Sequence, residues 1–168
     1  MITVRRIQLG EGELFRQLRL SSLQEAPYAF STTYASALQR SPESWQEQAD
    51  RTAQGSDRAT FIAFANDAPV GIAALYRHTD EPDTGEILQV WVAPKYRGAT
   101  GLAPALVDAI FQWAGPSGFQ TILATIRKDN KRAIAFYRSY GFRECGAASP
   151  NNPDEVVMTK ETSTWAKS

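Results

Sequence analysis

Sulfur and imidazole groups are nearly absent from this sequence. Its 168 residues include one cysteine, Cys145, and one histidine, His78. One cysteine cannot form an intrachain disulfide or a multi-cysteine metal cluster, and one histidine argues against a His-based metal site. No catalytic pattern of histidine and acid accompanies Cys145, so we interpret it as a strand residue rather than a nucleophile. We therefore expect chemistry that proceeds without a metal.

A net charge and long apolar runs are also missing. Eighteen basic and eighteen acidic residues cancel, so no overall field favours a nucleic acid or an anionic membrane. No apolar run approaches the roughly 20 residues that span a bilayer, and the first residues lack the apolar region of a signal peptide. These absences predict a cytoplasmic protein with no nucleic-acid or membrane partner. The length and the 43% of hydrophobic residues fit one globular domain.

The central stretch, residues 84–113, combines a strand, a glycine-containing loop and a helix. Gly98 and Gly101 lack a Cβ, so the loop can turn tightly and bring backbone N–H groups close to a ligand. The helix start that follows presents unpaired N–H donors and the positive end of the helix dipole, which suit a phosphate. Lys95 and Arg97 add positive charge. Apolar residues repeat at helical spacing, at Leu102, Ala105, Leu106, Ala109, Ile110 and Trp113.

Two common phosphate loops do not fit this glycine pattern. A P-loop requires Gly-Lys-Ser/Thr at the helix start, whereas Gly101 is followed by Leu102 and Ala103. A dinucleotide-binding loop follows an early strand and reads G-x-G-x-x-G, which is not found here. Taken alone, the glycine loop is compatible with a phosphate site or with an ordinary tight turn.

Apolar periodicity and capping residues predict an α/β fold around this stretch. Strands are expected at 2–8, 60–65, 70–76, 86–92, 121–126 and 155–159, with one more beginning at Phe142. Helices are expected at 11–25, 42–53, 102–113 and 131–140. Residues 28–40 show no clear period, and 147–154 is predicted to be a loop. Strands joined by helices in the C-terminal half need crossovers, so they can lie parallel in a mixed sheet.

A second motif opens the last predicted helix. Asn130, Ala133, Ile134 and Tyr137 are spaced i, i+3, i+4 and i+7, which places Asn130 and Tyr137 on one helical face. The stretch NKRAIAFYRSYGF at 130–142 resembles the N-x-x-A-x-x-x-Y-x-x-x-G-F signature of the GNAT superfamily of acetyl-CoA-dependent N-acetyltransferases.

Two further stretches resemble the same family and occur in the expected order. VWVAPKYRG at 90–98 is similar to its V-x-V-x-P-x-Y-R-G strand and loop entry. Residues 18–20 and 25–30 are similar to the N-terminal substrate-side helix and loop of many members. The resemblance covers almost the whole chain. It implies a single GNAT-like domain at 1–162 with a short tail at 163–168. The implied sheet is mixed and mostly antiparallel, with a parallel splayed strand pair and flanking helices.

The resemblance also implies acetyl-CoA as cosubstrate, an amine of a small molecule or peptide as acceptor, and direct transfer in a ternary complex. Dimerisation is frequent in the family, so a homodimer is a further expectation. Cofactor contacts are implied for Val90, Trp91, Val92, Arg97, Gly98, Ala99, Thr100, Gly101, Leu102, Ala103, Asn130, Ala133, Phe136 and Tyr137.

The pyrophosphate loop departs from the family pattern R/Q-x-x-G-x-G/A. Thr100 stands where a glycine is expected, and Gly101-Leu102-Ala103 completes the pattern one residue late. Either the loop carries a one-residue insertion or Gly98 takes the position of the arginine. In both interpretations Gly101 and Ala103 line the phosphates, while the role of Arg97 stays open.

Catalytic roles follow from the resemblance at two positions. Tyr137 matches the general acid that protonates the coenzyme A thiolate, and a phenol with a pKa of about 10 is only slightly weaker than a thiol of about 8.5. Glu86 matches the carboxylate that deprotonates the amine through water in several members, with His78 or water alone as alternatives. Asn130 matches a residue that binds the cofactor arm, and it can equally be a simple N-cap.

The acceptor is not identified by the sequence. Family members usually place acceptor contacts in the N-terminal region, so residues 28–50 should shape the pocket. Its Ser, Thr, Tyr and Trp side chains are compatible with a small amine, an amino acid, an antibiotic or a peptide N-terminus. A non-catalytic acyl-CoA sensor on the same fold is the rival, and it would not need Glu86 or Tyr137.

Overall fold

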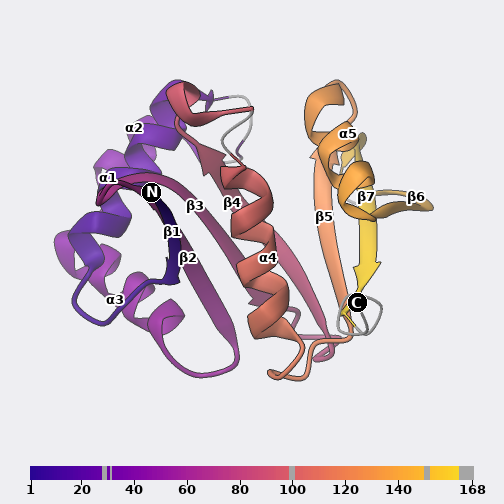
Figure 1. Ribbon diagram of the computed structural model, residues 1–168, viewed down its shortest axis with the longest axis horizontal. Coiled ribbons are helices and arrows are strands. Elements are labelled where there is room, and N and C mark those ends of the chain that lie inside the picture. Colours follow the sequence, from indigo (N-terminus) through magenta and orange to yellow (C-terminus); the bar gives the residue numbers. More distant parts are fainter. Residues whose placement is uncertain (28–29, 31, 99–100, 150–151, 163–168) are drawn as a thin grey trace. The chain divides into compact units, whose positions relative to one another are not determined.

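The computed structural model describes residues 1–27, 30, 32–98, 101–149 and 152–162 (Figure 1). The predicted tail at 163–168 lies outside the described residues, and the domain boundary at 162 stays a prediction. The elements follow one another as β1 (Ile2–Arg6), α1 (Gly12–Glu25), α2 (Tyr34–Leu38), α3 (Pro42–Ala53), β2 (Arg58–Ala65), β3 (Ala68–Arg77), β4 (Thr84–Val92), the 3-10 helix η2 (Pro94–Tyr96), α4 (Leu102–Ala114), β5 (Thr121–Arg127), α5 (Lys131–Tyr140), β6 (Arg143–Ser149) and β7 (Asn152–Glu161).

The strands form a mixed sheet in the order β1-β2-β3-β4-β5-β7-β6. The parallel pair is β4 with β5, with register from Thr84↔Thr121 to Ile87↔Ala124. This pairing confirms the predicted crossover, because α4 carries the chain from the end of β4 back to the start of β5. β5 and β6 each pair antiparallel with β7, so the crossover through α5 joins strands that are not neighbours.

The chain forms two compact units, one of Met1–Leu75 with Gln89–Ile110 and the other of Tyr76–Leu88 with Phe111–Ser168. In the first unit, α1 and α3 bury apolar residues at helical spacing against the sheet. Phe15 and Leu18 of α1 meet Trp45 of α3, and the rings of Phe15 and Trp45 pack edge to face at 5.6 Å. Ile62 and Ile72 supply the sheet side of this core.

The opposite sheet face of the first unit carries α4, where a glycine permits the close approach. A Cβ on Gly71 would lie 3.3 Å from Leu106 Cδ1 and 3.4 Å from the Ala63 Cβ. Leu106 is fully buried there. Strand side chains alternate between faces, which explains why Ile72 packs on α1 and α3 while Gly71 lies under α4.

The second unit packs aromatic residues around the end of α5. The Phe142 ring lies 5.1 Å from Tyr137 and 5.9 Å from Phe111, both in edge-to-face geometry. Gly141 ends α5 with a φ of 111°, a conformation that favours glycine, and its N–H donates to the Arg138 carbonyl. Elsewhere in this unit the Arg77 guanidinium lies 3.8 Å from the centre of the Phe119 ring and donates to the Ser117 and Pro82 carbonyls.

The capping residues in the sequence predict two helix starts correctly. Ser41 accepts from the Ser44 N–H at the start of α3, with Pro42 as the first helical residue. Asn130 accepts from the Ala133 N–H at the start of α5.

Two regions differ from the sequence prediction. The unsettled segment 28–40 contains the short helix α2, capped by the Thr33 side chain, while 28, 29 and 31 lie outside the described residues. The predicted loop 147–154 is wrong at 147–149 and 152–154, because β6 continues to Ser149 and β7 already begins at Asn152, while 150 and 151 lie outside the described residues. Cross-strand pairing such as Ala148↔Val156 extends both strands into a stretch whose Pro and Asn residues suggest a loop.

The start of α1 depends on a glycine that touches α3, and this contact gives a stability prediction. A Cβ on Gly12 would lie 2.7 Å from the Gln46 Cα, which is backbone and cannot move aside cheaply. We therefore expect Gly12→Ala to lower the free energy of unfolding by about 1–3 kcal/mol in urea denaturation. The control is Gly115→Ala, whose nearest neighbour would be 3.9 Å away, and a Gly12→Ala variant as stable as this control contradicts the prediction.

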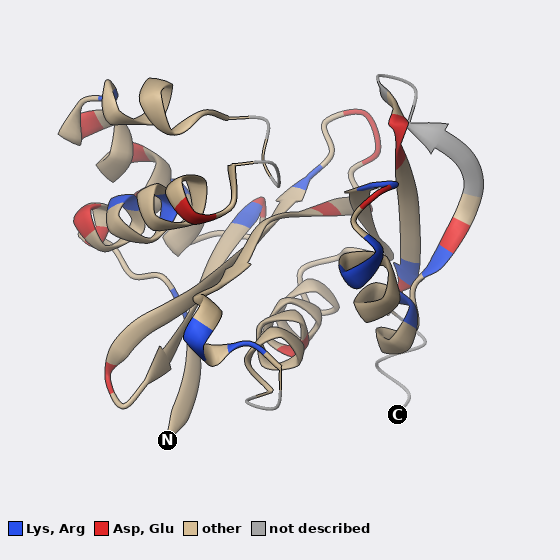
Figure 2. Ribbon diagram, turned by 90° about the horizontal axis from the view of Figure 1, so that it is seen from above, with Lys and Arg blue, Asp and Glu red and all other residues tan. Residues whose placement is uncertain are grey.

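Charged residues of both signs are interspersed along the helices and strands, as Figure 2 shows. Several form short-range pairs, such as Arg5 with Glu11 at 2.8 Å and Arg127 with Asp129 at 3.1 Å. No helix among the described residues is long and apolar enough to cross a membrane.

Candidate functional site

The glycine loop of the first unit has the backbone that the sequence predicts. Gly98 and Gly101 have φ values of 84° and 74°, which a side chain would strain, and a Cβ at either position would meet nothing within 4 Å. The first bond of α4 runs from the Ala105 N–H to the Gly101 carbonyl. Leu102 is 1% exposed, so its side chain packs into the protein interior and does not face a ligand. Ala99 and Thr100 lie outside the described residues.

The Arg97 side chain, which the sequence offered as a positive charge for a phosphate, is held by two contacts within the protein. Its NH2 group pairs with Glu25 Oε1 at 2.5 Å, and its Nε donates to the Val92 carbonyl at 2.9 Å. A positive charge compensated by a carboxylate is a weak attraction for a phosphate. The predicted contact of Arg97 with the cofactor is therefore expected from its backbone and stays a prediction. Lys95 is exposed, and its ammonium group lies above the Tyr96 ring.

The end of β4 is buried and contains an irregularity. Trp91 and Val92 are 8% and 7% exposed, and Val90 is half-buried. Gln89 adopts a φ of 62° inside the strand, a left-handed conformation that costs a non-glycine residue energy. Its Oε1 atom is buried with no hydrogen bond recorded among the described residues. Strained residues of this kind cluster at functional sites, so Gln89 is a feature of the candidate site that residue patterns missed.

The two candidate bases of the second unit lie against each other. His78 Nε2 is 3.0 Å from Glu86 Oε1, and their side chains are 33% and 25% exposed. The backbone N–H of His78 donates to the Thr84 carbonyl at the connection between β3 and β4, and this pairing brings the two side chains together. The sequence offered these residues as alternatives, whereas the structure makes them one hydrogen-bonded pair. Such a pair can hold or pass a proton.

Tyr137 projects from α5 into the aromatic cluster. It is 6% exposed, its ring lies 5.2 Å from Phe136 and 5.1 Å from Phe142, and burial raises the pKa of the Tyr137 phenol above its ordinary value of 10. Tyr137 thus keeps its proton at neutral pH, and it is a weaker acid than an exposed tyrosine.

The other predicted residues of α5 are placed at its first two turns. Asn130 is exposed and uses Oδ1 to cap the Ala133 N–H, so a bond to a cofactor arm is left to its side-chain NH2 group. Ala133 and Phe136 are half-buried. Together with Glu86 and Tyr137 they form the group of predicted site residues that the second unit holds.

Comparison with known proteins agrees with the residues described above. The family model for the Acetyltransferase (GNAT) family matches residues 22–142, a stretch that contains the glycine loop and all of α5. The chain belongs to the GNAT acetyltransferase family. The family predicted from the sequence motifs is therefore confirmed, as is the mixed sheet with a parallel strand pair.

Individual relatives are distant. An uncharacterized N-acetyltransferase of Methanocaldococcus jannaschii is 30% identical over 88 residues, which cover 50% of this chain and 38% of that protein. The chain thus spans well under half of that curated relative.

Among solved structures, a GNAT-family acetyltransferase from Streptococcus pneumoniae superposes with a TM-score of 0.78 at 20% identity, covering 96% of this chain and 99% of the other. The PaiA N-acetyltransferase of Thermoplasma acidophilum, solved with coenzyme A, gives 0.76 at 16% identity with the same coverages. At these identities the likeness shows the fold.

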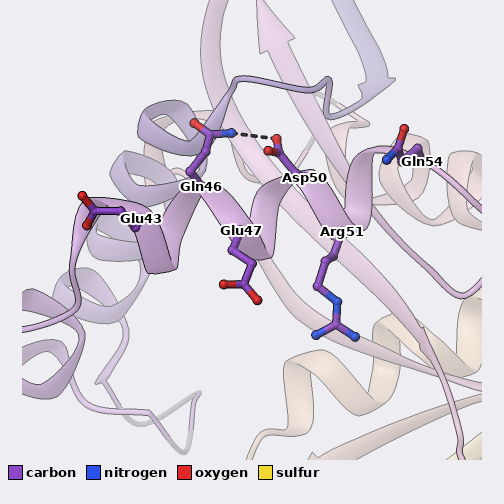
Figure 3. A pocket seen from close by; sticks show the side chains of 6 residues that line it. All are labelled: Glu43, Gln46, Glu47, Asp50, Arg51 and Gln54. Atoms are coloured by element: carbon purple, nitrogen blue, oxygen red, sulfur yellow. Dashed lines mark hydrogen bonds between the residues drawn. The ribbon is translucent and has the colours of Figure 1, made fainter.

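A hollow on α3 falls largely within residues 28–50, the stretch expected to shape the acceptor pocket, and none of the predicted cofactor-binding or catalytic residues lines it (Figure 3). It is lined by side chains of one helix and its C-cap, namely Glu43, Gln46, Glu47, Asp50, Arg51 and Gln54. Gln46 and Asp50 are hydrogen-bonded to each other at 2.7 Å. They also accept from the backbone N–H groups of Gly12 and Gly10, which explains their presence as support for the start of α1.

Proposed function

We propose that this chain is an N-acetyltransferase that moves the acetyl group of acetyl-CoA to a primary amine of a small molecule or peptide. The observation that carries the proposal is the glycine loop before α4, within a chain of the GNAT family. Gly98 and Gly101 leave open space where other residues carry a side chain, and the helix start supplies unpaired N–H donors. These features fit a pyrophosphate.

Acetyl-CoA supplies the acetyl group and a thiolate leaving group. The family resemblance assigns its carbonyl and pantetheine contacts to backbone groups of Val90, Trp91 and Val92. Backbone N–H donors aimed at the acetyl oxygen stabilise the negative charge that develops on it during the transfer. The coenzyme A in the Thermoplasma PaiA structure supports this choice of cosubstrate.

The acceptor must lose protons before and during the transfer. In the proposed reaction Glu86 accepts a proton from the ammonium form, through water, and His78 shares that proton across the 3.0 Å contact. His78 is one-third exposed, so the proton can leave to solvent from this side of the pair. The neutral amine then forms the new C–N bond directly, and the C–S bond breaks.

Tyr137 supplies the proton that the leaving group requires by donating its phenolic proton to the departing sulfur. The phenolate left on Tyr137 regains a proton from solvent or from the amide nitrogen as the tetrahedral adduct collapses. Burial keeps Tyr137 protonated at working pH. The same burial weakens the phenol as an acid, so the transfer depends on the basicity of the thiolate rather than on an activated tyrosine.

A panel of amines incubated with acetyl-CoA tests the proposal through the release of free thiol. The panel should hold polyamines, amino acids, aminoglycosides and short peptides, with an amine-free sample to measure hydrolysis. We expect amine-dependent thiol release with at least one class, and mass spectrometry of the product should show a gain of one acetyl group. Acetyl-CoA binding without turnover on any amine would instead support an acyl-CoA-binding protein.

A further inference from the structure

Two residues from distant parts of the first unit donate to one carboxylate oxygen of Glu25. Glu25 ends α1, Trp91 lies at the end of β4, and Arg97 opens the glycine loop. Trp91 Nε1–H donates to Glu25 Oε1 at 2.8 Å, and the NH2 group of Arg97 donates to the same oxygen. We call Glu25, Trp91 and Arg97 the Glu25 clasp.

The clasp is anchored on both of its donors. Trp91 is 8% exposed, so its indole has little freedom to turn away from Glu25. Arg97 also donates from Nε to the Val92 carbonyl at 2.9 Å, which ties the first residue of the loop to the end of β4. The bond from Trp91 and then the pairing with Arg97 lower the pKa of Glu25, so its carboxylate is charged at neutral pH.

The ion pair in the clasp is a weak source of stability. The side chains of Glu25 and Arg97 are 34% and 32% exposed, and pairs this open to water add little to the free energy of folding. Its geometric effect is larger, because one oxygen fixes an indole on β4 and a guanidinium on the loop together. The elements that it joins are those assigned to the cofactor.

We propose that Glu25 is a positioning residue for the acetyl-CoA loop, acting through Arg97 and Trp91. The proposal rests on the proposed function and adds a residue to it. The loop begins at Arg97, and its glycines permit many conformations, so an anchor at its first residue reduces the number that compete with the binding conformation. Arg97 accordingly acts on the pyrophosphate through the loop backbone rather than through its own charge.

A double-mutant cycle on acetyl-CoA binding tests this arrangement. The proteins are the parent, Glu25→Gln, Arg97→Gln and the double variant, with dissociation constants measured by calorimetry. We expect each single variant to weaken binding roughly 5- to 30-fold, and the double variant to be no weaker than the worse single one. In steady-state kinetics with an accepted amine, Glu25→Gln should act chiefly on the KM for acetyl-CoA rather than on kcat.

The matched control is Glu13→Gln, which removes the other acid of α1 that has an arginine partner, Arg16 at 3.2 Å. It should leave acetyl-CoA binding unchanged. Circular dichroism and urea denaturation of each variant verify that the fold is retained. Where Glu25→Gln is unstable, Glu25→Asp, which keeps the charge on a shorter side chain, takes its place in the cycle.

The outcomes separate the clasp from the proposed function. Additive losses, or a loss confined to Arg97→Gln, would mean that Arg97 contacts the phosphates directly and would overturn the role of Glu25 while acetyl-CoA binding stands. A larger effect of Glu25→Gln on the KM for the amine than on that for acetyl-CoA would overturn it as well. A parent protein that does not bind acetyl-CoA overturns the proposed function and the positioning role with it.

Discussion

Replacing Tyr137 with phenylalanine should lower kcat by about 100-fold or more while leaving acetyl-CoA affinity nearly unchanged. The substitution removes one hydroxyl and keeps the ring that packs on Phe136 and Phe142, so the aromatic cluster stays intact. The lost group is the proton donor to the thiolate, which is needed in the transition state and not for binding. An assay of thiol release measures kcat, and calorimetry measures the affinity for acetyl-CoA separately.

The pH dependence provides a second readout of Tyr137. Burial raises the pKa of its phenol above 10, so the folded enzyme keeps this proton until the solution is more alkaline than pH 10. We therefore expect no fall in the parent's kcat from loss of this proton below pH 10.

The control for Tyr137→Phe is Tyr140→Phe, the same substitution nearly one turn later on α5, where the ring packs against Phe111 at 5.7 Å. Turnover of Tyr140→Phe should stay close to that of the parent. Equal turnover of Tyr137→Phe and the parent would remove the general-acid assignment.

The second large effect is expected at the His78–Glu86 pair. Glu86→Gln should lower kcat/KM for the amine about 100-fold near neutral pH, because the amide cannot accept the ammonium proton. His78→Gln should have a smaller effect, since Glu86 then retains its carboxylate and loses only its partner at 3.0 Å. Profiles of kcat/KM against pH for the parent and both variants test whether this pair contains the base.

The shape of those profiles decides which group is the base. Loss of the ascending limb in Glu86→Gln alone supports Glu86, and loss in His78→Gln alone transfers the role to His78. Profiles of both variants that coincide with the parent's would leave water as the base. Glu144→Gln is the control, because Glu144 is an exposed acid of the second unit that pairs with Arg138 at 3.3 Å.

Local signals were sufficient for most of the fold because they act over one or two turns. Ser41 with Pro42, and Asn130 with Gly141, bracket helices through contacts with residues three or four positions away. The left-handed conformations of Gly98 and Gly101 likewise follow from what a missing Cβ allows. The family was visible for the same reason, since its signatures are short stretches of consecutive residues.

Other features needed contacts that no short window contains. The strands that replace the predicted loop at 147–154 exist because β6 pairs with β7. The positive φ of Gln89 inside β4 has no sequence signal, since glutamine is not a residue that favours this conformation.

The sequence by itself determined the boundaries of α1, α3, α4 and α5 to within about one residue, the glycine loop and the membership in the GNAT family, because each depends on neighbouring residues. Only the tertiary structure decided how the charged residues are used. Arg97 is 72 positions from Glu25, and the fold brings them together. The arginine therefore pairs with a carboxylate, although its position in the loop suggested a phosphate contact. His78 and Glu86 became one pair through the closure of the β3–β4 connection. Charge interactions depend on distance in space, which the order of residues does not specify.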